Sequence, residues 1–112
     1  MQFDVRADAL TDEVRVWATG ELDLAAVPVL RRTLRRAIEP GKTVVVELAG
    51  VSLIDSVGLG VLIGADRRLR EVGGHLVLHE PDARLRDLFA ATRVDELLDV
   101  RPSTGTTPVP SA

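Results

Sequence analysis

The alternation of apolar and polar residues at the start of the chain predicts two strands. Phe3, Val5 and Ala7 lie on one face of residues 3–7, and a second short apolar segment covers residues 14–19. A period of two is typical of a half-buried strand. The polar link at residues 11–13 is short, so we expect the two strands to form a hairpin, with Gly20 ending the second.

A helical period begins after Gly20. Asp23 can cap the helix through its carboxylate, and Pro28 falls in the first turn, where a missing N–H is tolerated. Pro and Gly at residues 40–41 stop the helix. The positions expected to face the core recur three or four residues apart: Val27, Leu30, Leu34 and Ile38.

Residues 43–48 (Thr-Val-Val-Val-Glu-Leu) are a nearly continuous run of apolar, mostly β-branched residues. Such a run predicts a central strand that is covered on much of both sides. A helix over residues 56–72 follows, ended by a glycine pair at 73–74 that suits a left-handed cap. Residues 75–79 (His-Leu-Val-Leu-His) are predicted to form another strand. A strand, a crossover helix and a strand in this order favour parallel pairing.

The last predicted helix begins at Asp82, which can cap it. Its expected inward-facing residues are Leu85, Leu88, Phe89 and Thr92. Residues 94–100 fit either a short helical turn or a last edge strand. From residue 101 to 112 the composition shifts to Pro, Ser, Thr and Gly, so we expect one domain over residues 1–100 and a disordered tail.

Three glycines, Gly58, Gly60 and Gly64, interrupt the helix that starts at Ser56. A glycine inside a helix costs about 1 kcal/mol relative to alanine, so each needs a reason, either the sheet beneath or a visiting molecule above. At about 100° per residue the residues expected in the core are Gly58, Val61, Leu62, Ala65, Leu69 and Val72. Those expected on the opposite side are Ser56, Gly60, Ile63, Arg67 and Glu71.

The outer side of this helix has two interpretations. An exposed Ile63 beside a glycine notch, within two turns of Ser56, fits a docking strip for a partner protein. Tight packing of helix on sheet with one stray surface Ile63 fits equally well, because single exposed apolar residues are common. Four arginines on the first helix, at residues 31, 32, 35 and 36, likewise fit an acidic partner or a solvated face.

Composition narrows the function classes. The chain of 112 residues has a net charge of −3, three aromatic residues and no cysteine, which argues against a nucleic-acid surface, a stacking platform or thiol chemistry. The sequence shows neither a secretion signal nor a run of the roughly 20 apolar residues that span a bilayer, so we expect a cytoplasmic protein without membrane contact.

Several catalytic and metal sites fit the residues poorly. His75 and His79 share a strand face, but two histidines without a third ligand make a weak metal site. Ser56 lacks the Gly-x-Ser-x-Gly elbow of a hydrolase. Gly58 and Gly60 lack the third glycine at the spacing of a dinucleotide fingerprint. We therefore expect no enzyme activity, no cofactor and no metal.

Two motifs resemble a known family. Residues 55–62, Asp-Ser-Val-Gly-Leu-Gly-Val-Leu, are similar to the Asp-Ser-(Ser/Thr)-Gly-Leu-Gly signature of the STAS domain, in particular of bacterial anti-sigma factor antagonists. Residues 20–23, Gly-Glu-Leu-Asp, match a motif that ends an early strand in the same family, and the spacing of the two motifs fits. One position departs: Val57 stands where many members carry Ser or Thr. The resemblance extends to about residue 100.

The resemblance implies an α/β fold, a single STAS-type domain with a mixed four- to five-stranded sheet and about four helices. It implies phosphorylation at Ser56 by an anti-sigma factor that is also a serine kinase, and dephosphorylation by a PP2C-type phosphatase. The unmodified protein would bind the anti-sigma factor and release a sigma factor. The residues expected to bind the partner are Asp23, Asp55, Ser56, Val57, Gly58, Gly60, Ile63 and Arg67.

Two other functions remain open at this point. One is a STAS scaffold whose Ser56 is never phosphorylated, as a subunit of a lipid transporter or a signalling complex. The other is a small enzyme or nucleotide-binding protein that uses the amino end of the Ser56 helix to hold phosphate. Nucleotide binding without a protein partner would favour the second.

Overall fold

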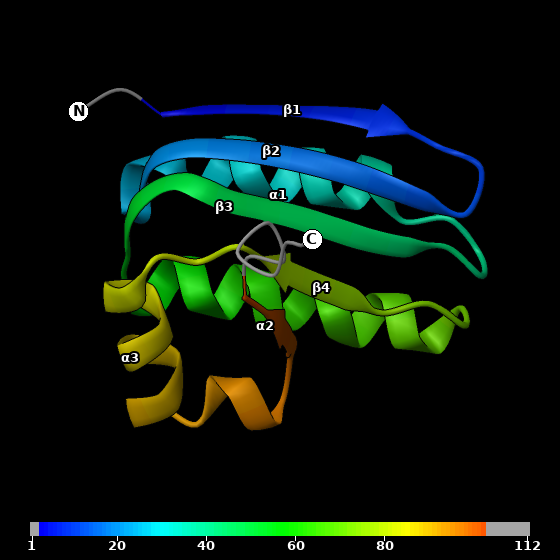
Figure 1. Ribbon diagram of the computed structural model, residues 1–112. Helices are drawn as coiled ribbons and strands as arrows, with labels where there is room; N and C mark the ends of the chain where they lie inside the picture. Colours follow the sequence, from blue (N-terminus) through cyan, green and yellow to red (C-terminus); the bar gives the residue numbers. More distant parts are fainter. Residues whose placement is uncertain (1–2, 103–112) are drawn as a thin grey trace, which may run out of the picture.

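The strands of the protein form one mixed sheet whose spatial order follows the chain, β1-β2-β3-β4-β5 (Figure 1). The computed structural model describes residues 3–102. The strands are β1 Asp4–Ala9, β2 Glu13–Leu22, β3 Thr43–Ile54, β4 Leu76–His79 and β5 Asp99–Arg101. β1 pairs antiparallel with β2, and all later neighbours pair in parallel. The predicted hairpin and the predicted parallel crossover are both confirmed.

Helices connect the parallel strands. The α-helices are α1 Val27–Ala37, α2 Ser56–Glu71 and α3 Ala83–Ala91, and two single 3₁₀ turns are η1 Leu24–Ala26 and η2 Val94–Glu96. Residues 3–102 thus contain three α-helices rather than about four, because the segment after Asp23 and the segment at 94–96 each make only one 3₁₀ turn. The segment that fitted a turn or a strand contains both, η2 and then β5.

β2 and β3 are longer than their apolar runs predict. Gly20 does not end β2: it has φ 92° and lies within a strand that continues to Leu22. β3 likewise continues past Leu48 to Ile54. Two register shifts, between Trp17 and Thr19 and between Gly20 and Glu21, let the two strands stay paired to the end. Gly20 suits the second shift because glycine adopts positive φ without a Cβ clash.

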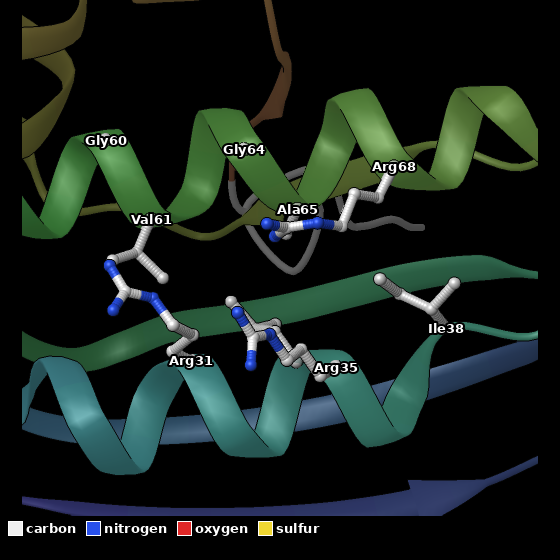
Figure 2. A pocket seen from close by; sticks show the side chains of 9 residues that line it. Arg31, Arg35, Ile38, Gly60, Val61, Gly64, Ala65 and Arg68 are labelled. Atoms are coloured by element: carbon white, nitrogen blue, oxygen red, sulfur yellow. The ribbon is translucent and has the colours of Figure 1, made fainter.

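The hydrophobic core lies between the sheet and helices α1 and α2, which lie side by side on one face (Figures 1 and 2). Its fully buried side chains come from every layer: Phe89, Leu22, Leu30, Leu48, Leu62, Leu69, Leu76, Leu78, Val16, Val44 and Val46. Most of the expected inward positions of α1, α2 and α3 are therefore confirmed by their burial.

Three expected core positions are wrong. Val72 follows the last residue of α2 and is 38% exposed, because the chain leaves helical geometry there and turns through Gly73 at φ 86°. Ala7 and Thr92 are also exposed. Ala7 is on an edge strand, and the Thr92 hydroxyl donates to the Leu88 carbonyl at 2.7 Å instead of packing inward.

The carboxyl end of the described chain is ordered through β5. Arg101, expected to start the tail, is the last residue of this strand and pairs with His79. The rest of the predicted tail, from residue 103, lies outside the described residues. Among residues 3–102 no helix has the length and apolar character needed to cross a bilayer.

Candidate functional site

The junction of β3 and α2 places a serine hydroxyl on the surface. Ser56 is the first residue of α2 and is exposed. Asp55 precedes it in extended backbone, and its carboxylate accepts a hydrogen bond from the Gly58 amide at 2.9 Å. This is N-cap geometry, in which a side chain satisfies an amide that has no helical partner. The predicted hydroxyl at a helix start is therefore present.

Asp55 acts on the helix start rather than on the serine. Its carboxylate bonds the Gly58 amide, and its carbonyl accepts from the Leu59 amide at 2.9 Å. No hydrogen bond of the Ser56 hydroxyl joins it to any other residue between 3 and 102. The hydroxyl is thus free for an incoming group, while the carboxylate fixes the backbone below it.

Asp23 comes to the same edge of the sheet. β2 and β3 end together with Leu22 opposite Ile54, and the Asp55 amide donates to the Leu22 carbonyl at 3.2 Å. Asp23 follows directly and accepts from the Ala25 amide at 3.1 Å, capping η1. Asp23 and Asp55, both among the residues expected to bind the partner, thus follow the paired ends of neighbouring strands, and each carboxylate caps a turn of helix.

The glycines of α2 have different reasons. A Cβ on Gly58 would lie 2.3 Å from the Leu22 carbonyl oxygen, so this residue is small because the first turn of α2 sits directly on the end of β2. A Cβ on Gly60 would meet nothing within 4 Å. The sequence left two explanations for these glycines, close packing on the sheet or contact with a visiting molecule. Packing on the sheet explains Gly58, whereas Gly60 faces open space and is not explained by packing.

The predicted docking strip is narrower than expected. Ile63 is half-buried and packs against the hydrophobic core, so its interpretation as an exposed contact is wrong. The buried stripe of α2 is wide because both α1 and the sheet touch it. Gly60 and Arg67 are exposed, as is Val57 at 40%. Apart from Val57, the exposed residues on this side of α2 are therefore polar or small rather than apolar.

Two exposed leucines that the sequence did not single out provide apolar surface at this end. Leu24 is 68% exposed in η1, next to Asp23, and Leu53 is 43% exposed two residues before Asp55. A hollow of about 230 Å³ adjoins Leu53 between the end of β3 and α3. A leucine in an apolar run is expected to be buried, so the sequence pattern does not predict that Leu53 is exposed. The one available signal is its position close to the end of the strand.

One group of side chains on the other face of the sheet has the composition of a metal site. The ligand atoms of Glu47, His79 and Glu80 lie within 4.8 Å of one another. Glu47 is 8% exposed and binds both the Arg15 guanidinium and His79 Nδ1, the latter at 2.7 Å. Arg15 already supplies the positive charge that Glu47 needs, so we assign this group a structural role. His75 bonds Asp99 at 3.2 Å instead.

Removing the cap of α2 should destabilise the protein. We expect Asp55→Ala to lower the free energy of unfolding by about 1 kcal/mol, since the Gly58 amide loses its acceptor, and to lower Tm by about 4–8 °C. Thermal unfolding followed by circular dichroism measures this. Asp55→Asn is the matched control, because asparagine also caps. A Tm of Asp55→Ala equal to that of Asp55→Asn would contradict the capping role.

Comparison with known proteins identifies the family. The model of the family described as Mlab, STAS domain matches residues 5–99. The chain belongs to the STAS domain family. Among curated proteins of this family, the anti-sigma-B factor antagonist of Bacillus subtilis (strain 168) is 33% identical over 100 residues, covering 89% of this chain and 92% of the relative. The STAS expectation drawn from the two motifs is confirmed.

Solved STAS structures agree with the fold. The anti-sigma factor antagonist SpoIIAA in its unphosphorylated form has a TM-score of 0.71 at 25% identity, covering 92% of each chain. SpoIIAA from Bacillus in its phosphorylated form has a TM-score of 0.68 at 24% identity, covering 92% of this chain and 95% of that one. Both forms of that protein thus share the architecture described above.

Proposed function

We propose that this STAS protein is an anti-sigma factor antagonist: it binds an anti-sigma factor, thereby frees a sigma factor, and is switched off by phosphorylation of Ser56. The names of the curated relatives and the existence of SpoIIAA in phosphorylated and unphosphorylated forms support the class. The observation that carries the proposal is the exposed Ser56 at the start of a capped, well-packed α-helix.

The position of Ser56 suits an added phosphate. The first amides of a helix have no carbonyl partner and carry partial positive charge, so they favour an anion at this place. Phosphoserine carries about −1.5 to −2 charges at neutral pH. Because the helix start accepts this charge and the hydroxyl makes no internal hydrogen bond, phosphorylation should leave the fold unchanged and act on the partner alone.

The surroundings of Ser56 suit a partner protein. Val57, Leu24 and Leu53 expose apolar surface beside it, and Asp23 and Asp55 add carboxylates. A partner that buries this end must desolvate the phosphate next to Asp55. Juxtaposed like charges across an interface cost several kcal/mol. The switch we propose is therefore electrostatic and local, on a scaffold that does not rearrange.

The partners follow from the same proposal. The anti-sigma factor is a serine kinase that uses ATP, and a PP2C-type phosphatase restores the free hydroxyl, in the bacterial cytoplasm. The protein itself acts by binding and is the substrate of the kinase, not an enzyme. The surface at Asp23, Asp55, Val57, Gly60 and Arg67 would contact the partner. Gly58, which is buried against the end of β2, and the half-buried Ile63 would only support this surface from below.

Phosphate transfer tests the proposal. The protein is incubated with the anti-sigma factor kinases of the same organism and ATP, and the product is mapped by mass spectrometry. We expect one phosphate on Ser56 and none on Ser56→Ala. Ser52, an exposed serine on β3 whose hydroxyl donates to Gly20, is an internal control. Binding to an anti-sigma factor without transfer from any of these kinases would instead indicate a constitutive scaffold.

A further inference from the structure

A groove between α1 and α2 lies outside the proposed phosphorylation site. It has a volume of about 110 Å³. Three arginines from two helices surround it, Arg31 and Arg35 from α1 and Arg68 from α2, and Figure 2 shows their side chains directed into the space between the helices. Its floor is apolar, formed by Leu34, Ile38, Val61 and Ala65.

The three guanidinium groups have no counter-charge. Between residues 3 and 102, no ion pair or side-chain hydrogen bond includes Arg31, Arg35 or Arg68. Another arginine of α2 differs from these three, because the Arg70 guanidinium binds the Asp66 carboxylate at 2.7 Å. A cleft lined by one sign of charge over an apolar wall concentrates the electric field and attracts the opposite charge.

Glycine creates the space. Gly60 and Gly64 are one turn apart on the side of α2 that lines the groove. A Cβ on Gly60 would meet nothing within 4 Å, and one on Gly64 would meet only the Arg68 guanidinium at 3.9 Å. Neither glycine is needed for helix packing, although each costs about 1 kcal/mol in a helix. The result of having them is a hollow beneath the arginines.

Charge is segregated along the chain. Residues 27–37 and 56–71, which form α1 and α2, contain seven arginines and two acidic residues, and one of these acids, Asp66, is buried in its pair with Arg70. All other residues contain seven basic and fifteen acidic side chains. An acidic protein thus presents a basic surface where α1 and α2 lie side by side, which is specific to this layer and not a property of the whole.

We propose that the groove between α1 and α2 binds a phosphate-class anion, held by Arg31, Arg35 and Arg68. The donor set fits this chemistry: guanidinium groups donate paired hydrogen bonds to phosphate oxygens, and three cations match a dianion with three or more oxygens better than a carboxylate with two oxygens and one charge. The site is separate from Ser56 and does not depend on its phosphorylation.

The size and lining of the groove restrict the ligand. A water molecule occupies about 30 Å³ in the liquid, so the groove has room for a phosphoryl group, whereas pockets for larger ligands usually exceed about 300 Å³. No lining residue is aromatic, so no surface for stacking a nucleobase is present among them. The ligand is free inorganic phosphate or the phosphoryl group of a small phosphomonoester.

Thermal unfolding and NMR titration test this site without a protein partner. Inorganic phosphate, glycerol phosphate and acetate are each added at constant ionic strength against sodium chloride. We expect phosphate or glycerol phosphate to raise Tm, as any ligand of the folded state does, and to shift the amide signals of Gly60 and Gly64. The ligand that binds more tightly shows whether the groove prefers free phosphate or a phosphomonoester, and acetate should bind more weakly than both.

A matched pair of variants separates the groove from general positive charge. Arg35→Gln removes a lining guanidinium and should weaken phosphate binding by about tenfold, the size of one charge-assisted contact. Arg32→Gln removes the same charge from an exposed position of α1 that does not line the groove, and should change binding less than twofold. Equal losses in both variants, acetate binding as strongly as phosphate, or no shift at Gly60 and Gly64 would each overturn the proposal.

Discussion

Replacing Ser56 by Asp should weaken binding of the anti-sigma factor by about a hundredfold or more, whereas Ser56→Ala should bind like the unmodified protein. The aspartate places a carboxylate beside Asp55 at the surface that we propose the partner covers. Repulsion with desolvation across an interface costs several kcal/mol, where 1.4 kcal/mol corresponds to tenfold in affinity. Isothermal titration of the purified partner with each variant measures the effect.

Thr11→Asp is the matched control for charge. Thr11 is exposed in the turn between β1 and β2, at the end of the sheet away from the start of α2 (Figure 1). The Thr11→Asp variant adds one negative charge outside the proposed surface. Its affinity for the anti-sigma factor should therefore stay within twofold of that of the unmodified protein. Equal affinity of Ser56→Asp and Ser56→Ala would refute the electrostatic switch while leaving partner binding intact.

Gly58→Ala should destabilise the protein although it replaces a glycine inside a helix. Its new Cβ would lie 2.3 Å from the Leu22 carbonyl oxygen and 3.3 Å from the Ile54 side chain. The first contact is with backbone, so α2 must move off the end of β2. Overpacking of this kind costs about 1–3 kcal/mol, more than the roughly 1 kcal/mol that alanine gains over glycine in a helix. Chemical denaturation measures the loss.

Gly60→Ala provides the opposite expectation two residues away. Its Cβ has nothing within 4 Å, so only the gain in helix propensity remains, and the free energy of unfolding should rise by up to about 1 kcal/mol. The two variants make the same chemical change in the same helix. A stability loss in Gly60→Ala as large as that in Gly58→Ala would show that the position of α2 on β2 is not the cause.

The two variants also separate the roles of α2. Its first turn is fixed by Gly58 on the end of β2 and by the cap from Asp55. These contacts fix the position of Ser56, the proposed phosphorylation site. In its middle, Gly60 and Gly64 leave unfilled space beside the helix. One helix therefore carries the proposed phosphorylation site at its start and an arginine-lined groove along its side.

Much of this followed from local sequence. Helical and strand periods are properties of neighbouring residues, so the hairpin, the crossover and the starts of α2 and α3 could be predicted from the pattern. Caps are equally local: an Asp before a helical run bonds an amide three residues later, and both Asp55 and Asp82 do so, at 2.9 Å each. The family motifs then named the exposed serine and its fold.

Only the tertiary structure decided which residues meet across elements. Whether a helical glycine faces a carbonyl or open space depends on the neighbouring strand, which is why Gly58 and Gly60 look alike in sequence. The width of the buried stripe on α2 depends on α1 as well as on the sheet, so Ile63 was misplaced. Arg35 and Arg68 are far apart in the chain, and their approach over a shared groove results from packing two crossover helices side by side, which no local period encodes.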